Sequence, residues 1–313
     1  MRKLISYAAV LVLLTSVATA QDYTFRVLVN KGVNKIQRAG GGSPEALKTG
    51  SKLFENDQII ASEGAYIGLM HKSGKTTEIK EQGTQKVSEI AKTINVAGTS
   101  ITSRYAKFVS NKMNAEENTD YRSRMNAIGA VSRAAGSAAI NILIPPTVDV
   151  VSTSSIIRWE APEEAAEGIV YSVKIKNIFD DVIYEAETSE TFVEIDFTKP
   201  EMANDAGLYL VKVYNTADDE IHSSEVGIKK VDLSDRAEML ENLAALKAEI
   251  SDDTPLNKII FASFYEENGL FLDALTKYEE AIAMAPEVEE FKSMYQEFKI
   301  AAKLISDDSE VDE

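Results

Sequence analysis

The chain has 313 residues, of which 44% are hydrophobic and 27% are charged, and this composition predicts two or three folded domains. Its formal net charge of -17 becomes -19 without Arg2 and Lys3, which disfavours binding to nucleic acid or to an anionic membrane surface. The sequence shows no local basic patch that would escape this argument. The absence of cysteine excludes disulfides and thiolate chemistry, and two histidines, His71 and His222, leave little material for a metal site.

Residues 1–20 have the three parts of a secretory signal peptide. Arg2 and Lys3 form the positive start, Ile5–Leu14 is apolar, and Ala18-Thr19-Ala20 places small residues before a cleavage site. A permanent anchor would need about 20 apolar residues, and polar Thr15 ends this run early. We therefore expect cleavage after Ala20, no integral membrane segment in the mature chain, and a periplasmic or secreted location.

Residues 21–93 are expected to form an all-β domain. Phe25, Val27 and Val29 alternate with outward positions, and further short strands follow between glycine-containing turns. The segments that carry a family resemblance are Leu47–Leu53, Asn56–Ile60, Gly64–Leu69 and Ser73–Lys75. They resemble the FecR-type β domain. Some members of that family signal across the envelope from behind a membrane anchor, and we do not transfer that role because the sequence shows no such anchor.

Residues 94–146 are expected to form a helical connector. Ile101, Tyr105, Phe108 and Val109 have helical spacing, and Ser100 is a candidate cap. The run Ala134–Ile144 is too short to span a bilayer.

Residues 147–231 are expected to form a β-sandwich. Four alternating segments, 155–159, 171–175, 191–195 and 207–214, have the period of half-buried strands. The pattern resembles a fibronectin type III or immunoglobulin-like domain, with Trp159 between two sheets and Tyr209 at the corner position of that family. We expect both rings to be core residues rather than a ligand platform.

Residues 232–305 are expected to be helical, and residues 306–313 form an acidic tail that we expect to be disordered. Helices are expected at 236–250, where Ser234-Asp235 is a candidate cap, and at 287–304. Between them, a frame of 34 residues beginning at Pro255 resembles a tetratricopeptide repeat (TPR). The resemblance is carried by Ala262, Tyr265, Gly269, Phe271, Ala274, Tyr278, Ala281 and Pro286. The fold class is thus multidomain, mainly β and then α.

The sequence favours a chain that is not an enzyme and has no catalytic, cofactor-binding or metal-binding residues. Ser73-Gly74-Lys75-Thr76 lacks the upstream glycine of a phosphate-binding loop and is expected to be a hairpin turn. Acidic pairs such as Asp180-Asp181 and Asp218-Asp219 are expected in solvated turns. A hydrolase with an unrecognised carboxylate pair is the least favoured hypothesis.

Binding is the remaining class of function. The first helix of each pair in the TPR family lines a concave groove, and the resemblance places Ser263, Glu266 and Glu267 on its outward positions, with Leu256 and Ile259 as an apolar floor. The two glutamates would favour a partner that presents basic side chains or an N-terminal amine, although a simply solvated face is the more common reason for such charges. We expect an envelope adaptor that displays this groove on a rod of β domains, binds an unidentified protein and has no nucleic-acid partner. The alternative is a cell-wall or polysaccharide-binding protein that acts through the FecR-like domain.

Overall fold

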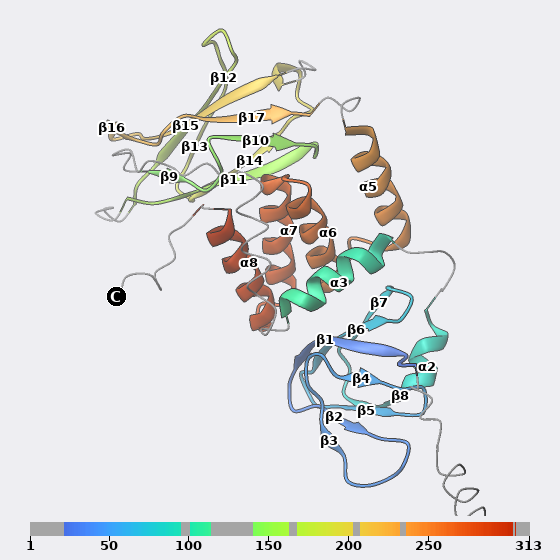
Figure 1. The fold of residues 1–313 in the computed structure, drawn as a ribbon. Helices are drawn as coiled ribbons and strands as arrows, with labels where there is room; N and C mark the ends of the chain where they lie inside the picture. The colour runs from blue at the N-terminus through green and yellow to red at the C-terminus, as the bar shows by residue number, and fades with distance from the viewer. Residues whose placement is uncertain are drawn as a thin grey trace, which may run out of the picture.

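The helices in the C-terminal part of the chain lie between two groups of β-strands (Figure 1). The computed structural model describes residues 22–94, 101–113, 140–162, 168–202, 207–231, 236–302 and 304. The expected signal peptide, the acidic tail and the candidate caps Ser100 and Ser234-Asp235 lie outside these residues. The expected order of β-strands followed mainly by α-helices is confirmed, but the β domains do not form a rod that displays the helices at its end. The helices instead contact both β groups.

The first group, here called the N-terminal module (residues 22–94), contains two antiparallel sheets. Their strand orders are β4-β1-β6-β7 and β3-β2-β5-β8. The bounds are β1 Phe25–Lys31, β2 Lys35–Gln37, β3 Glu45–Ala46, β4 Lys52–Leu53, β5 Gln58–Ala61, β6 Tyr66–His71, β7 Thr76–Ile79 and β8 Gly83–Lys86, followed by helix α2 Val87–Lys92. The expected turn at residues 73–76 joins β6 to β7, with Gly74 at a φ of 89° and its N–H donating to the carbonyl of His71.

Strand β1 contributes to two different cores. Phe25 and Val27 are buried inside the N-terminal module, together with Ile36, Ile59 and Ile67. A shift of register between Val27 and Val29 turns the strand, so that Leu28 and Val29 are buried against the rest of the molecule. The module therefore has a core of its own and an apolar face that helices cover.

The second group, here called the sandwich (residues 140–231), places two sheets face to face. The larger has the order β10-β17-β15-β12-β13, with β16 paired to β15, and the smaller has the order β14-β11-β9. The bounds are β9 Asn141–Ile142, β10 Thr147–Val150, β11 Ser154–Glu160, β12 Tyr171–Lys176, β13 Val182–Thr188, β14 Phe192–Asp196, the 3-10 turn η3 Pro200–Met202, β15 Leu208–Asn215, β16 Asp218–His222 and β17 Val226–Lys230.

Both aromatic residues singled out in this region are core residues, as expected. Trp159 is 3% exposed and packs edge-on against Tyr171 at 5.3 Å between ring centres. Tyr209 is 2% exposed, and its hydroxyl donates to the carbonyl of Met202, which joins strand β15 to the turn before it. The smaller sheet also includes β9, because Asn141 and Ile142 pair with β11. This end of the segment expected to be a helical connector is therefore a strand.

Helix α6 begins at Pro255, where the expected repeat frame starts. Thr254 caps α6 by accepting from the N–H of Asn257, and Pro255 occupies the first turn, where its missing N–H costs nothing. Gly269, at a φ of 72°, allows the turn into α7. The bounds are α3 Ile101–Met113, α5 Ala237–Glu249, α6 Pro255–Glu267, α7 Phe271–Met284 and α8 Glu289–Ala301.

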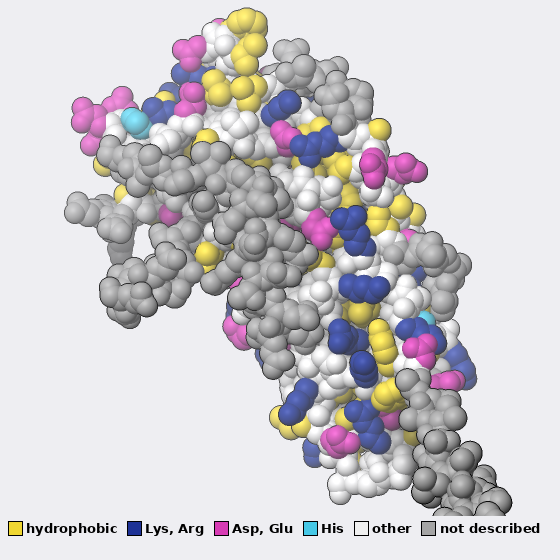
Figure 2. Space-filling model, viewed as in Figure 1, with side chains coloured by type: hydrophobic (Ala, Val, Ile, Leu, Met, Phe, Trp, Pro, Cys, Tyr) yellow, Lys and Arg dark blue, Asp and Glu magenta, His cyan; other side chains and the backbone are white. Residues whose placement is uncertain are grey.

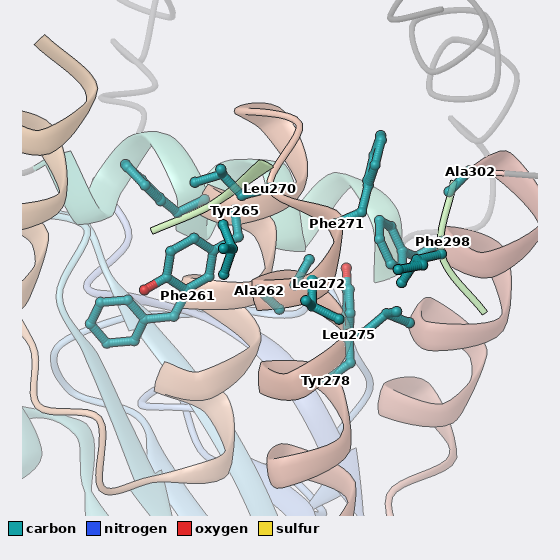
Figure 3. Close-up of a cluster of buried hydrophobic side chains, with 14 of the residues drawn as sticks. Phe261, Ala262, Tyr265, Leu270, Phe271, Leu272, Leu275, Tyr278, Phe298 and Ala302 are labelled. Atoms are coloured by element: carbon teal, nitrogen blue, oxygen red, sulfur yellow. The ribbon is translucent and has the colours of Figure 1, made fainter. Parts of the chain in front are cut away.

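Helices α6, α7 and α8 share a tightly packed apolar interior (Figure 3). Small Ala262 and Ala281 are fully buried and let α6 and α7 approach closely, while Tyr278 packs against Phe298 of α8 at 5.5 Å between ring centres. The same apolar cluster continues into both β groups, since it includes Val29 of β1 and Val150 of β10. Among the described residues, no helix combines the length and apolar character needed to cross a bilayer.

Candidate functional site

The expected binding groove is filled by helix α3 of the same chain. Ser263 and Glu266, both expected to face outward, are each 0% exposed. Leu256 and Ile259, the expected apolar floor, are also fully buried in the continuous core. The outward orientation predicted for Ser263 and Glu266 is therefore wrong. The reason is that a single helical pair cannot bury its own faces, so α3 packs across α6.

A buried charged cluster joins α3 to the helical pair. The Lys112 ammonium of α3 donates to both carboxylate oxygens of Glu266, each at 2.9 Å, and lies 3.3 Å from the Tyr278 hydroxyl. The Tyr278 hydroxyl in turn donates to Glu266 at 2.7 Å. Burial raises the pKa of Glu266 and lowers the pKa of Lys112, and the contact between the two opposes both shifts. All three side chains are buried, so the cluster stabilises the docking of α3 and is not accessible to a substrate.

The remaining candidate, Glu267, is partly accessible. Its side chain is 23% exposed and accepts from the Arg104 guanidinium of α3 at 2.9 Å. Ser263 does not face a partner either, because its hydroxyl donates to the carbonyl of Ile259 in its own helix. A partner protein could reach Ser263 and Glu266 only if α3 were displaced.

Helix α5 supplies the cap that α3 needs. The Glu249 carboxylate accepts from the N–H groups of Ile101 at 3.1 Å and Thr102 at 3.0 Å, and from the Thr102 hydroxyl at 2.7 Å. A carboxylate at this position also complements the partial positive charge of the helix N-terminus. This contact joins residues about 150 positions apart, which is why neither sequence segment indicates it alone.

A polar cavity of about 290 Å³ lies where the sandwich meets the helices. Burial raises the pKa of Asp273 to about 6, opposed by hydrogen bonds from Ser152 and Val151. A carboxyl with a raised pKa beside a cavity is a typical acid–base candidate. However, one carboxylate oxygen of Asp273 accepts from the Ser152 hydroxyl and the other from the Val151 N–H. Two charged residues of the lining are also paired with each other, since Lys277 contacts Glu280 at 2.8 Å. The site therefore resembles an interface more than a reaction centre.

A second cavity of about 520 Å³ lies between the N-terminal module and the start of α6. Glu78 accepts from the N–H of Leu256 at 2.9 Å and from the Tyr66 hydroxyl at 2.7 Å. The Thr76 hydroxyl donates to Asn257 at 2.7 Å. These groups fix the module to the helix, and Lys80, also in the lining, pairs with Glu78 at 3.1 Å.

The tip of the β12–β13 hairpin presents apolar side chains to solvent. Ile178 is 63% exposed and Phe179 is 78% exposed. The Asn177 side chain accepts from the N–H groups of Phe179 at 2.8 Å and Asp181 at 3.0 Å, which fixes the loop. Asp180 has a φ of 70°, an uncommon conformation for a residue with a side chain. A shallow hollow of about 180 Å³ adjoins this tip.

Several of these positions were not predicted from the sequence. The expectation of a solvated turn holds for Asp180-Asp181, whereas Asp218-Asp219 begin strand β16. Lys112, Glu249 and Asp273 were missed because each of them contacts residues that lie far away in the sequence.

Within the described residues, no three potential metal ligands gather at one place. Neither a protein-family model nor a curated protein matches the sequence, so the resemblances to FecR, fibronectin type III and TPR domains stay predictions.

Proposed function

We propose that this chain is a non-enzymatic, exported envelope scaffold in which TPR-like helices hold a FecR-like module and a fibronectin III-like sandwich at a fixed separation. The observation that carries the proposal is that the two β groups are attached to opposite ends of helix α6. Leu256, near its start, donates its N–H to Glu78 of the N-terminal module. Asn268, just after its end, accepts from Arg236, which also pairs with Asp149 of the sandwich.

Helix α6 has the properties of a rigid central spacer. Its 13 residues correspond to about 20 Å. Apart from Lys258 and Glu267, every residue of the helix is buried. A helix surrounded in this way has no free face on which to bend or rotate, so it transmits the position of one β group to the other.

The partner contact of such a scaffold must lie on its outer surfaces, because α3 fills the groove. We assign it to the hairpin tip formed by Ile178 and Phe179. Rigid aromatic anchors account for much of the affinity in protein interfaces, and a loop fixed before binding loses little conformational entropy. The acidic neighbours Asp180 and Asp181 favour a partner whose apolar pocket has a basic rim.

A cross-linking experiment in the native host tests this function. A photo-reactive amino acid replaces Phe179 in the full chain, and the same residue at Val33, which is 81% exposed on the N-terminal module, is the control. We expect a discrete protein adduct from position 179 that is absent from position 33. The purified partner should then bind Phe179→Ala about 10- to 100-fold more weakly than the unmodified chain. Equal affinity of the partner for the unmodified chain and for Phe179→Ala would contradict the assignment of the partner contact to the hairpin tip.

A second function, binding of cell-wall glycan through the N-terminal module, is favoured by a separate observation. The N-terminal module, residues 22–94, contains eleven Lys and Arg against eight Asp and Glu, and helix α3 adds Arg104, Lys107 and Lys112, so residues 22–113 carry +6 in a chain of -17. Co-sedimentation of the full chain with isolated cell walls tests it. Retention of all the protein in the supernatant at low salt would exclude this function.

A further inference from the structure

The net charge of the whole chain hides two regions of opposite charge, which the structure places apart. Residues 114–313 contain seventeen Lys and Arg against forty-two Asp and Glu, a charge of -25, whereas residues 22–113 carry +6. Figure 2 shows the consequence on one face, where Lys and Arg side chains gather along α3 and the N-terminal module with few acidic side chains between them. The expectation that the chain has no local basic patch is therefore wrong.

Four basic residues of α3, β1 and β4 are connected by helical spacing, one hydrogen bond and strand pairing. Arg104 and Lys107 are exposed and one turn apart on α3. Ser110, one further turn along, accepts from the Arg26 guanidinium of β1 at 3.3 Å. Arg26 stands directly opposite Lys52 of β4 in the antiparallel ladder, and Lys52 is exposed. We call Arg104, Lys107, Arg26 and Lys52 the basic row.

The basic row is only partly neutralised by the protein. Arg104 pairs with Glu267, but no described carboxylate forms an ion pair with Lys52, Lys107 or Arg26. The buried Nε of Arg26 has no hydrogen-bond partner among the described residues. Like charges directly opposite each other across two strands are destabilising. The Arg26–Lys52 pair is therefore an arrangement that an anion between the two side chains would stabilise.

The acidic sandwich, which carries -11 in residues 140–231, does not cancel this field; the other -14 lies in residues 232–313, where Glu267 is the described carboxylate that pairs with the basic row. The sandwich is attached beyond the far end of α6, about 20 Å from the end that holds the N-terminal module. At physiological ionic strength the screening length is about 8 Å. Repulsion from the sandwich is therefore largely screened at the basic row.

We propose that the basic row binds a linear acidic polysaccharide, with successive carboxylate or other anionic groups placed along α3 and across β1 and β4. This inference rests on the second function, wall binding by the N-terminal module, and names the chemistry of its ligand. A row of separated charges fits a polymer with repeating anions better than a single small anion. Single-stranded nucleic acid is less well matched, because its binding uses exposed aromatic rings, and no aromatic side chain described in residues 22–113 is fully exposed.

Fluorescence anisotropy with the full mature chain tests the proposal. The probes are labelled polygalacturonate, uncharged dextran of the same length and a 20-nucleotide single-stranded DNA. We expect binding to polygalacturonate at 50 mM NaCl that weakens about 10- to 100-fold at 200 mM, as anion contacts and released counterions require. Dextran should not bind, and the DNA should bind more weakly than polygalacturonate.

Two charge-matched variants locate the site. Lys52→Gln with Lys107→Gln should weaken polygalacturonate binding about tenfold, whereas Lys229→Gln with Lys247→Gln, on exposed positions of β17 and α5, should change it less than twofold. No binding to polygalacturonate, an equal loss in both variants, or tighter binding to the DNA would each overturn the proposal. If the first variant still co-sediments fully with cell walls, wall binding stands and the assignment to the basic row fails.

Discussion

Asp273 is the residue whose protonation most directly affects the junction between sandwich and helices. It is 2% exposed, and both of its carboxylate oxygens accept hydrogen bonds from the sandwich. Its pKa is raised to about 6, above its ordinary value of 3.8. The folded state therefore holds the proton more tightly than the unfolded state does. The associated stability is fully present below the unfolded pKa and is lost as the pH rises through about 6.

Replacing Asp273 with Asn should remove this pH dependence. We expect the free energy of unfolding of the unmodified chain, relative to Asp273→Asn, to increase by about 1 kcal/mol when the pH falls from 8 to 5. Urea unfolding of both proteins at several pH values measures the difference. Asp180→Asn, on the exposed hairpin tip, is the control and should follow the unmodified chain. A constant difference across this pH range would show that Asp273 does not titrate there.

The Lys112–Glu266 pair makes a second prediction for single residues. Lys112→Ala leaves a buried carboxylate without its counter-charge, which we expect to cost about 3–5 kcal/mol of unfolding free energy. Lys112→Met combined with Glu266→Gln removes both charges, keeps an acceptor for Tyr278 and should recover most of that loss. Glu267→Gln, at the partly exposed pair with Arg104, should cost less than about 1 kcal/mol. Denaturant unfolding compares the three, and a double variant no more stable than Lys112→Ala would contradict the pairing.

At the level of elements, helix α3 depends on a cap from another helix. Glu249→Ala removes three hydrogen bonds from its first turn and should cost about 1–2 kcal/mol. Hydrogen exchange should then become faster over residues 101–113 and stay unchanged in strands β12 and β15. Glu241→Ala, on the exposed face of α5, is the matched control. Faster exchange spread equally over the sandwich would indicate general destabilisation instead of loss of the cap.

The elements differ in how far the sequence determines them. The alternation of residues 207–214 and the start of a helix at Pro255 are local signals, and the structure confirms both. The position of α3 is not local, because it depends on Glu249 and Glu266, which lie far along the chain. One signal was nevertheless present in α6. Its residues Ile259–Phe261, Ala262 and Phe264 are apolar on every side, and a helix of this kind is surrounded by other elements. That pattern argues against an open groove beside Ser263 and Glu266.

The whole molecule combines one shared core with one separate core. The shared core includes Val29 of β1, Leu256 of α6 and Val150 of β10, so the N-terminal module, the helices and the sandwich stabilise one another. The N-terminal module also keeps Phe25, Val27 and Ile59 in a core of its own. The three parts should therefore unfold together, although the N-terminal module contains enough core to respond separately if its junction with α6 is broken.

Gly68 offers a way to break that junction. A Cβ at this position would lie 3.1 Å from Leu256 of α6 and 3.4 Å from Val29, so Gly68→Val should push the module away from the helix. Gly40→Val is the matched control, because a Cβ there meets nothing within 4 Å. Trp159 is the single tryptophan of the chain and reports on the sandwich alone, whereas circular dichroism reports on every element.

In the unmodified chain and in Gly40→Val, thermal unfolding followed by Trp159 fluorescence and by circular dichroism should have the same midpoint, as a single cooperative transition requires. In Gly68→Val, circular dichroism should show an additional phase that Trp159 does not report, because the N-terminal module then unfolds independently of the sandwich. Coincident midpoints in Gly68→Val would mean that the N-terminal module does not unfold independently of the sandwich. Different midpoints in the unmodified chain would mean that α6 does not couple the two β groups, and the scaffold function would lose its physical basis.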